Sequence, residues 1–400
     1  MDTDRLYYRD SYLREFEATV LAARPVGGET EVVLDRTAFH PEGGGQPSDL
    51  GTLAGFPVLG VVERDGRVVH RVAGAVPGGA VVGRIDWDRR FDHMQQHSGQ
   101  HLLSQALVRC AGAETVSFHM GDVGSTVDLA TPALTREQVE AAERLTNQVI
   151  WENHPILVHV VEPSELARFE LRKGTERTEQ IRLVEVPDFD AIPCGGTHCR
   201  TTGEIGMVKV VRWERRGGNS RVEFLCGGRA LGDYGRKNET VLRLASLLSV
   251  RDREVGDAVE RLLRDSSAMK HQVEQLRRRL LDYRTSELAR QAVAVGRAQV
   301  VAAVQPDSSP EDLKLMASRL TAEQGRVVLL AATGSRAHLL FARSDDLPMD
   351  AAALLRQVCA TFGGRGGGQP GLAQGGIPDA GRVAEALDIA IRAVRALLAG

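Results

Sequence analysis

Residues 91–107 read FDHMQQHSGQHLLSQAL, and this stretch is the starting point for interpreting the whole chain. We predict that it forms a helix. His97 and His101 are four positions apart, so on a helix both imidazoles project from one face. His93 lies one turn earlier on that face and is a candidate third ligand or a partner of a ligand. The pair predicts a metal site, although a polar helix face with scattered histidines is an equally good explanation of this motif alone.

A second pair of donors lies further along the chain, in the sequence PCGGTHC of residues 193–199. Its two glycines permit a tight turn, so that Cys194 and His198 face one point. Cys199 points elsewhere in most geometries and is a reserve ligand. The alternative is a buried cysteine beside a loop histidine. The two pairs together supply four donors of the kind that zinc prefers. We therefore predict one zinc ion per chain, bound by His97, His101, Cys194 and His198.

Two longer segments carry a resemblance to a known family. HMQQHSGQHLLS at 93–104 and VPDFDAIPCGGTHCRTTGEIG at 186–206 resemble the editing domain of alanyl-tRNA synthetase. They are also similar to its free-standing relatives, the trans-editing proteins of the AlaX type. FHPEGGGQPSDLG at 39–51 resembles a third motif of that family, with His40 in place of the usual tyrosine.

A fourth segment is glycine-rich. Residues 362–376, FGGRGGGQPGLAQGG, resemble the signature of the synthetase's C-terminal domain, which is related to the DHHA1 family. The four matches follow the family's order along the chain. A complete synthetase also needs a class II aminoacylation domain before the first motif. Because the chain begins close to that motif, we expect no charging of tRNA.

The resemblance implies a multidomain α/β (α+β) fold. Residues 1–90 alternate apolar and polar positions between glycine and proline turns, which is typical of short antiparallel strands. The family version of this region is a β-barrel. We predict four parts: a β-barrel domain at 1–90, a zinc-binding editing domain at 91–235, a helical or coiled-coil linker at 236–298 and a DHHA1-like tRNA-binding domain at 299–400.

Three finer predictions concern secondary structure in the middle of the chain. A strand is expected near residues 124–129. A helix is expected from Thr135 to about Asn153, because Thr135 and Gln138 have the spacing of a capping box. The linker shows apolar residues at alternating spacings of four and three, which is a heptad pattern interrupted once by serine. It predicts either a coiled coil that joins two subunits or a helix that packs on the chain's own neighbours. The expected homodimer would form through this linker or through the C-terminal domain. These positions are Val255, Val259, Leu262, Ser266, Met269, Val273, Leu276, Leu280 and Tyr283.

The last hundred residues predict α/β structure. We expect a strand at 299–304, a helix at 310–324 that begins with proline, a hairpin from strands 326–333 and 337–343 around Gly334–Arg336, and a terminal helix at 379–398. The glycine-rich segment lies between these elements as a loop. It is not a P-loop, because no Gly-Lys-Ser/Thr follows. It is either a plain surface loop or, as the resemblance implies, a tRNA-contacting surface. Its predicted contacts are Arg365, Gly366, Gly367, Gly368 and Gln369.

Composition limits the classes of function. The chain has 400 residues and a net charge of -3, so any RNA contact must come from local patches rather than a uniformly basic surface. No run of about 18 apolar residues is present, so we expect neither a transmembrane helix nor a membrane partner. The charged start MDTDRLYYRD does not resemble a signal peptide. Five widely spaced cysteines do not predict a disulfide framework, which favours a cytoplasmic location.

The resemblance implies a trans-acting, zinc-dependent hydrolase that deacylates mischarged tRNA(Ala), carrying serine or glycine. Four protein ligands nevertheless resemble a structural zinc site, because catalytic zinc usually keeps one position open. The general base is not identified. Two alternatives stay open: a catalytically inactive zinc-containing tRNA-binding module, and a zinc hydrolase that acts on a small ester or amide rather than on tRNA. The predicted substrate-binding residues are Gly43, Gly44, Gly45, Gln46, Gln100 and Ser125, each of which also has a purely structural explanation.

Overall fold

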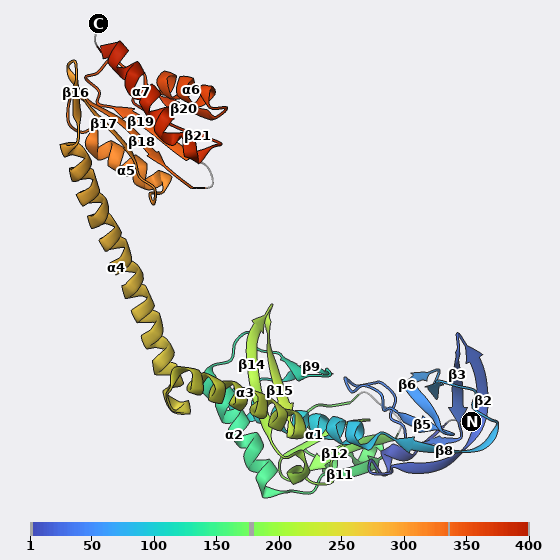
Figure 1. Ribbon diagram of the computed structural model, residues 1–400. Helices are drawn as coiled ribbons and strands as arrows, with labels where there is room; N and C mark the ends of the chain where they lie inside the picture. The colour runs from blue at the N-terminus through green and yellow to red at the C-terminus, as the bar shows by residue number, and fades with distance from the viewer. Residues whose placement is uncertain (1–2, 176–179, 335–336, 399–400) are drawn as a thin grey trace. The chain divides into compact units, whose positions relative to one another are not determined.

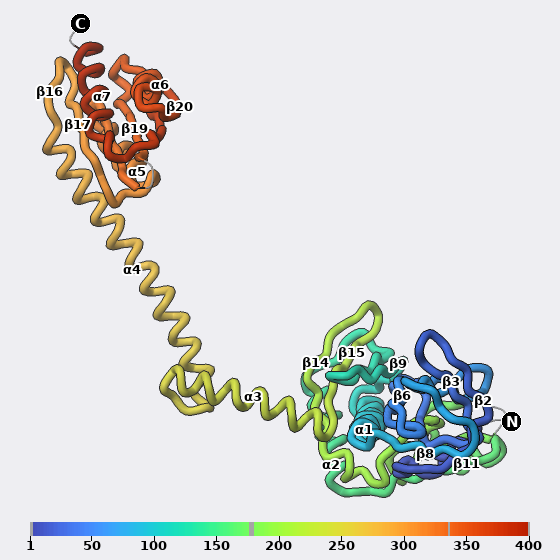
Figure 2. The backbone as a smooth tube through the Cα atoms, turned by 45° about the vertical axis from the view of Figure 1, so that its right-hand side comes forward, coloured from blue at the N-terminus to red at the C-terminus, as the bar shows by residue number. Residues whose placement is uncertain are grey.

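The computed structural model describes residues 3–175, 180–334 and 337–398, and the chain divides into two compact units (Figures 1 and 2). Unit 1 is Met1–Leu247 and unit 2 is Leu248–Gly400. The division into four domains stays a proposal. One of its boundaries differs from the secondary structure, because helix α3 (Gly227–Leu248) continues through residue 235, where the linker was predicted to begin.

The N-terminal part of unit 1 is a closed barrel with the strand order β2-β3-β7-β6-β5-β8. Alternate residues point inward, as in β3, where every second side chain is buried. Strands β1 and β4 form a separate, short parallel pair. The bounds are β1 Asp4–Arg5, β2 Glu15–Val26, β3 Glu29–Leu34, β4 Arg36–Thr37, β5 Gly51–Leu53, β6 Phe56–Arg64, β7 Arg67–Val72 and β8 Gly79–Ile85.

The predicted histidine-bearing helix is α1 (Trp87–Ala111), four residues longer at each end than expected. Its start is fixed by Asp86, whose side chain accepts a hydrogen bond from the Arg89 amide. Its end is fixed by Gly112, which adopts the left-handed conformation at φ 61°. In Figure 2 the trace of α1 lies between the barrel and the β14–β15 hairpin.

Two further sheets and α2 surround α1. One sheet has the order β14-β15-β10-β9 and the other β11-β12-β13. Helix α2 (Arg136–Glu152) begins with the predicted Thr135–Gln138 capping box and ends at Asn153, so that prediction is confirmed. The strands are β9 Thr115–Met120, β10 Ser125–Leu129, β11 Leu157–Val161, β12 Ile181–Val186, β13 Asp190–Pro193, β14 Val208–Arg216 and β15 Asn219–Cys226. Short 3-10 helices of the chain are η1 Leu6–Tyr8, η2 Pro163–Arg168, η3 Thr202–Ile205, η4 Asp252–Glu254 and η5 Ala380–Arg382.

Unit 2 contains a six-stranded sheet in the order β16-β17-β18-β19-β21-β20. Helix α5 and the C-terminal end of α4 cover one face, and α6 and α7 cover the other (Figure 1). The elements are α4 Val255–Arg290, β16 Val293–Val295, β17 Ala298–Val304, α5 Pro310–Leu320, β18 Arg326–Ala332, β19 Ala337–Arg343, α6 Ala351–Thr361, β20 Arg365–Gln369, β21 Leu372–Ile377 and α7 Val383–Leu398.

Most predicted elements of unit 2 are present, with two differences at their ends. Helix α5 stops at Leu320, four residues early, because the chain turns at Gly325, whose amide donates to the Asp346 carboxylate. The terminal helix begins with the short turn η5 before α7. The predicted turn between β18 and β19 contains Ser335 and Arg336, which lie outside the described residues.

The glycine-rich segment is not the loop that was predicted. Its residues form the antiparallel hairpin β20–β21, and β20 is an edge strand of the sheet. The glycines have a packing role, since a methyl group on Gly366 would lie 2.8 Å from the Leu355 side chain and one on Gly375 would lie 2.8 Å from the Cys359 sulfur. Helix α6 therefore packs closely on the hairpin because side chains are absent there.

The predicted helical linker consists of two helices, α3 and α4, separated where Ser249 adopts a positive φ of 54°. Only the last turns of α4 pack on the unit 2 sheet, through Leu281 and Leu288. Most of the heptad positions are exposed: Val259, Leu262, Met269, Val273, Leu276, Leu280 and Tyr283. Among the described residues, no helix is long and apolar enough to cross a membrane.

The barrel contains a titratable group that should make unit 1 sensitive to acid. The imidazole of His70 is fully buried, and its two nitrogens face Thr37 Oγ1 at 2.8 Å and the Val32 carbonyl at 3.0 Å. Burial lowers the pKa of His70 to about 4, against 6.5 for an unburied histidine. Below pH 6.5 the unfolded chain therefore binds more protons than the folded chain, so the free energy of unfolding decreases as the pH falls towards 4.

We expect the wild-type protein to lose about 2 kcal/mol more than His70→Gln in free energy of unfolding between pH 7 and pH 5. Urea unfolding followed by tryptophan fluorescence measures this difference, because all three tryptophans lie in unit 1. Equal pH dependence in the two proteins would contradict the assignment.

Candidate metal centre

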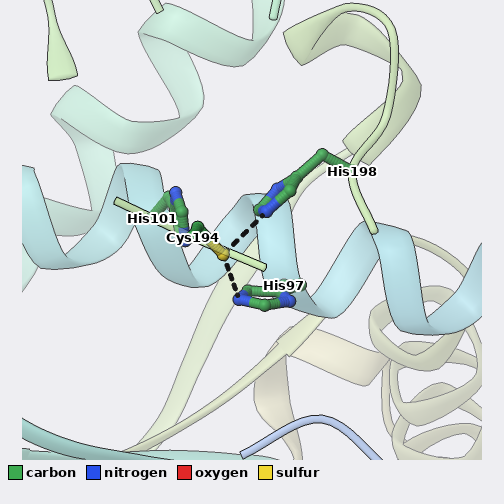
Figure 3. Close-up of side chains that lie close together, drawn as sticks. All are labelled: His97, His101, Cys194 and His198. Carbon is green, nitrogen blue, oxygen red and sulfur yellow. Dashed lines mark hydrogen bonds between the residues drawn. The ribbon is translucent and has the colours of Figure 1, made fainter. Parts of the chain in front are cut away.

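The two donor pairs singled out in the sequence meet in unit 1. The ligating atoms of His97, His101, Cys194 and His198 all lie within 4.8 Å of one another. Figure 3 shows the four side chains pointing towards one another, two from α1 and two from the chain that follows β13. The three histidines are buried and Cys194 is half-buried. His93 and Cys199, the reserve candidates, are not members of this cluster.

Helix α1 can carry this cluster because it packs very closely on β15. A methyl group on Gly99, between the two histidines, would lie 2.3 Å from the Cys226 sulfur. Gly99 therefore sets the distance between helix and sheet. On the other side of the cluster, the loop that bears Gly196 packs closely on His97, since a methyl group on Gly196 would lie 2.2 Å from His97 Cε1.

Hydrogen bonds orient two of the imidazoles. His97 Nδ1 lies 2.8 Å from Gln46 Oε1, and because an amide oxygen only accepts, Nδ1 carries the proton. His97 Nε2 is then left with its lone pair facing the cluster. His198 Nδ1 lies 3.2 Å from Ser98 Oγ, which likewise leaves Nε2 on the cluster side. Partners of this kind fix the tautomer and direction of a metal-binding histidine.

Gln46 connects three parts of unit 1. Its Oε1 also accepts from the Thr197 amide at 3.2 Å, and its Nε2 donates to Thr197 Oγ1 at 2.9 Å. The side chain is almost completely buried. One residue of the barrel loop therefore ties α1 to the loop that bears Cys194 and His198.

Arg182 holds the cysteine from the other side. Its Nη1 donates to the Cys194 carbonyl at 2.6 Å, and its Nε donates to the Tyr8 carbonyl at 3.3 Å. The Cys194 amide in turn donates to the Arg182 carbonyl at 3.0 Å. The Gly196 amide points at the Cys194 sulfur from 3.4 Å. These groups place positive charge and an N–H beside the sulfur.

The electrostatics of the cluster suit a cation. Burial lowers the pKa of His97 to about 3, and burial also lowers the pKa values of His101 and His198 well below the ordinary value. All three imidazoles are therefore neutral at pH 7 and have lone pairs to donate. Burial raises the pKa of the Cys194 thiol. A bound cation reverses this last effect, because a coordinating thiol is deprotonated.

The donor spacing fits zinc. Zinc lies about 2.3 Å from sulfur and about 2.0 Å from nitrogen, so a tetrahedral angle separates two such donors by roughly 3.5 Å. The Cys194 sulfur lies 3.5 Å from His97 Nε2 and 3.3 Å from His198 Nε2 (Figure 3). Three neutral imidazoles and one cysteine are also a donor set that zinc uses.

Three members of the cluster, His97, His101 and Cys194, line a cleft of about 580 Å³. The barrel loop supplies the facing wall through His40, Pro41, Glu42, Gly43 and Gly44. Phe118 contributes an apolar side, and an Arg5–Glu63 ion pair of 2.8 Å lies at another. The cleft can therefore enclose a small polar group next to the four donors.

The predicted substrate-binding residues occupy different places. Gly43 and Gly44 line the cleft, as does Gln100, whose amide also donates to Ser104 Oγ at 2.7 Å. Gly44 and Gly45 have positive φ values at the centre of a tight turn, in which Gly43 and Gln46 exchange backbone hydrogen bonds of 3.0 Å. Gly45 packs against the Phe118 carbonyl, and Gln46 hydrogen-bonds His97 and Thr197. Neither Gly45 nor Gln46 lines the cleft.

Ser125 is not brought to the cleft. It is buried in the sheet, where it pairs with Met120 of β9 and Phe224 of β15. Its hydroxyl has no hydrogen-bond partner within the described chain. The predicted tRNA contacts Arg365, Gly366, Gly367, Gly368 and Gln369 belong to unit 2, where they form strand β20.

Several residues of the site were not identified from the sequence. Arg182 was the easiest of them to predict, because it is a lone arginine in the otherwise apolar start of the sequence IRLVEV. Ser98 and Thr197 lie inside the two quoted motifs, but their roles depend on which side chain faces them. Tyr8 and Arg5 come from a segment with no recognisable pattern.

Comparisons with known proteins show the family to which this chain is similar. The domain family described as "Threonyl and Alanyl tRNA synthetase second additional domain" matches residues 181–223, and the DHHA1 domain matches residues 297–396. The protein named "Alanyl-tRNA editing protein AlaX-L" from Pyrococcus horikoshii is 31% identical over 407 residues, which cover 99% of each chain.

Longer proteins match as well. The alanine–tRNA ligase of Pyrococcus furiosus is 35% identical over 97% of this chain, and the match spans 43% of the ligase. The chain therefore spans less than half the length of that relative. The C-Ala domain of Aquifex aeolicus alanyl-tRNA synthetase covers 27% of this chain with 24% identity and a TM-score of 0.25, too low a score to support a structural argument.

Gly196 provides a sharp test of the metal centre. In Gly196→Ala the added methyl group displaces His97, so we expect zinc affinity to fall at least roughly tenfold, as for other changes beside a ligand. Gly195→Ala is the matched control, because its nearest contact would be the Tyr8 hydroxyl at 3.3 Å. Competition against a chromophoric chelator measures both affinities. Equal affinities in the two variants would contradict the assignment.

Proposed function

Because this chain belongs to the family of alanyl-tRNA editing proteins, we propose that it is a zinc-dependent hydrolase acting in trans on mischarged tRNA(Ala). The observation that carries the proposal is the convergence of four zinc donors, three of which line a cleft. The preferred substrate is Ser-tRNA(Ala), with Gly-tRNA(Ala) as the second candidate. We place the reaction in the cytoplasm, as expected for an enzyme that works on aminoacyl-tRNA.

The chemical need for such an enzyme follows from the size of alanine. Glycine is smaller than alanine and cannot be excluded by a pocket that accepts alanine. Serine adds one hydroxyl group, which an apolar pocket rejects by only about a hundredfold. A second, hydrolytic site corrects the error by cleaving the ester at the tRNA 3′ end.

The residues divide this task. His97, His101, Cys194 and His198 would hold zinc, which when bound polarises an ester carbonyl or a water molecule. Gln46 and Ser98 keep the Nε2 atoms of two histidines directed at the centre. Gln100 and the backbone of Gly43 and Gly44 would contact the aminoacyl group, because they line the same cleft. Phe118 excludes water on one side.

Four protein ligands leave open how the metal contacts the substrate. One ligand can leave, the coordination can expand to five, or the metal only orients the ester. Of the four, Cys194 is the half-buried member, whereas the histidines are buried. The cysteine is therefore the ligand that faces the cleft most openly.

We assign tRNA contact outside the cleft to β20. It is an edge strand, so its outer backbone groups are free of sheet pairing within the described chain. Its glycines allow phosphates to approach the amides closely, and the exposed Arg365 adds charge. Arg365, Gly366, Gly367, Gly368 and Gln369 are the proposed contacts.

We also propose that α4 joins two copies of the chain. Its exposed apolar positions follow a heptad pattern through several turns, and this pattern favours a coiled coil. A second copy is the partner that carries the same seam. Leu281 and Leu288, which are covered by the helix's own sheet, are not heptad positions, so the seam stays exposed as far as Tyr283.

The activity test uses purified Ser-tRNA(Ala) and the full chain. We expect rapid release of serine, which falls at least roughly a hundredfold after chelation and in Cys194→Ala, and which returns when zinc is added to the chelated protein. Cys110→Ala is the control, because Cys110 is a free cysteine outside the cluster. Hydrolysis that persists after complete zinc removal would contradict zinc dependence. Retained tRNA binding without hydrolysis would identify an inactive binding module.

The dimer is tested by light scattering coupled to gel filtration. We expect wild-type protein at twice the chain mass of 43.4 kDa and Leu276→Glu at the monomer mass, because a buried charge in the seam is costly. Gln275→Glu introduces the same charge one position away, off the seam, and should stay dimeric. A monomeric wild-type protein would contradict this proposal.

A further inference from the structure

His40 is a buried imidazole of the barrel loop. It is 4% exposed and lines the cleft, and its Nδ1 is buried without a hydrogen-bond partner in the described chain. Buried polar atoms in folded proteins are nearly always paired, because an unpaired one costs about 1–3 kcal/mol. Nδ1 itself is closed to solvent, so a partner from outside the chain would bind the part of the ring that lines the cleft.

A second histidine of the same barrel shows what a structural imidazole looks like here. His70 is equally buried, yet both of its nitrogens are within hydrogen-bonding distance of Thr37 and Val32. Both ring nitrogens of His70 are therefore paired within the barrel. His40 differs from it because its Nδ1 has no partner in the described chain and because it faces the cleft that contains the metal centre.

The surrounding structure holds His40 firmly. Its amide donates to Asp49 Oδ2 at 2.5 Å, and its carbonyl accepts from the Asp49 amide at 3.0 Å. Asp49 is fixed in turn by a fully buried ion pair with Arg90 of α1, with 2.9 Å between Arg90 Nε and Asp49 Oδ1. The Tyr7 ring contacts the imidazole edge-on at 5.2 Å between centroids.

The Asp49–Arg90 ion pair contributes little to stability unless it also positions another group. A buried ion pair gains little net stability, since both ions must be desolvated. Here it fixes the backbone of a residue that lines the cleft and whose Nδ1 has no partner in the described chain. The arrangement is that of a recognition group that is held in place before its ligand arrives.

The chemistry of the ring selects the ligand. Burial lowers the pKa of His40 to about 4, so the imidazole is neutral at pH 7. Nδ1 has no partner in the described chain that would fix the tautomer, so the other ring nitrogen, Nε2, can carry either an N–H or a lone pair. A hydroxyl group, which both donates and accepts, matches such a partner. An ammonium group would instead favour a carboxylate, and Glu42 offers one in the same cleft.

We propose that His40 hydrogen-bonds the side-chain hydroxyl of a seryl group in the cleft and so favours seryl esters over glycyl and alanyl esters. This inference rests on the proposed deacylase function and names the residue that sets its specificity. His40 acts on the substrate and does not hold the metal, so the metal content is expected to be unchanged in its variants.

The test compares kcat/KM for Ser-tRNA(Ala) and Gly-tRNA(Ala) in the wild type, His40→Phe and His70→Phe. In His40→Phe we expect a roughly tenfold loss on the seryl ester and less than about a twofold change on the glycyl ester. His70→Phe removes a paired buried imidazole away from the cleft. It should lower the melting temperature and leave the ratio of the two esters unchanged. His40→Gln, which can donate and accept, should recover part of the seryl preference.

A binding measurement separates this inference from the proposed function. Calorimetry with non-hydrolysable seryl and glycyl amides of 3′-terminal adenosine compares the two side chains without turnover. We expect His40→Phe to weaken the seryl amide selectively while its zinc content equals that of the wild type. If wild-type protein releases no serine, the deacylase proposal fails, and the amides still test His40. Equal losses for both side chains, or no loss for either, would overturn the role of His40.

Discussion

The structure of unit 1 depends on burying three neutral imidazoles and a thiol around one point. Polar donors are costly to bury, and four of them within 4.8 Å make sense energetically only if a cation accepts their lone pairs. The neighbouring groups agree with this requirement. Gln46 and Ser98 direct two imidazoles inward, while Arg182 and the Gly196 amide supply positive charge and an N–H beside the sulfur.

The need to orient the four donors also explains how the barrel is joined to the rest of unit 1. Gln46 leaves the barrel loop to contact His97 and Thr197, so the metal centre and the cleft wall are set by one side chain. The Asp49–Arg90 ion pair adds a second connection, between the loop and the start of α1. Together they place His40 opposite the four donors.

The sequence was sufficient to single out four side chains that the structure brings together, and to predict most of the elements that carry them. His97 and His101 share a helix face, and the Thr135 capping box begins a helix where expected. It was not sufficient where the outcome depends on tertiary contacts. Gln46 looked like a substrate contact until its amide was found against His97. The glycine-rich segment looked like a loop because glycine disfavours strands, but α6 packs on it and β19 pairs with β21. The prediction that Ser125 contacts the substrate rested only on its position after a glycine.

Zinc K-edge X-ray absorption of the purified full chain tests the central claim most directly. The account predicts one zinc per chain, with one sulfur at about 2.3 Å and three nitrogens at about 2.0 Å. Loss of the sulfur contribution in Cys194→Ala would assign that ligand. A wild-type protein without bound zinc, or with a shell of oxygen atoms only, would contradict the account.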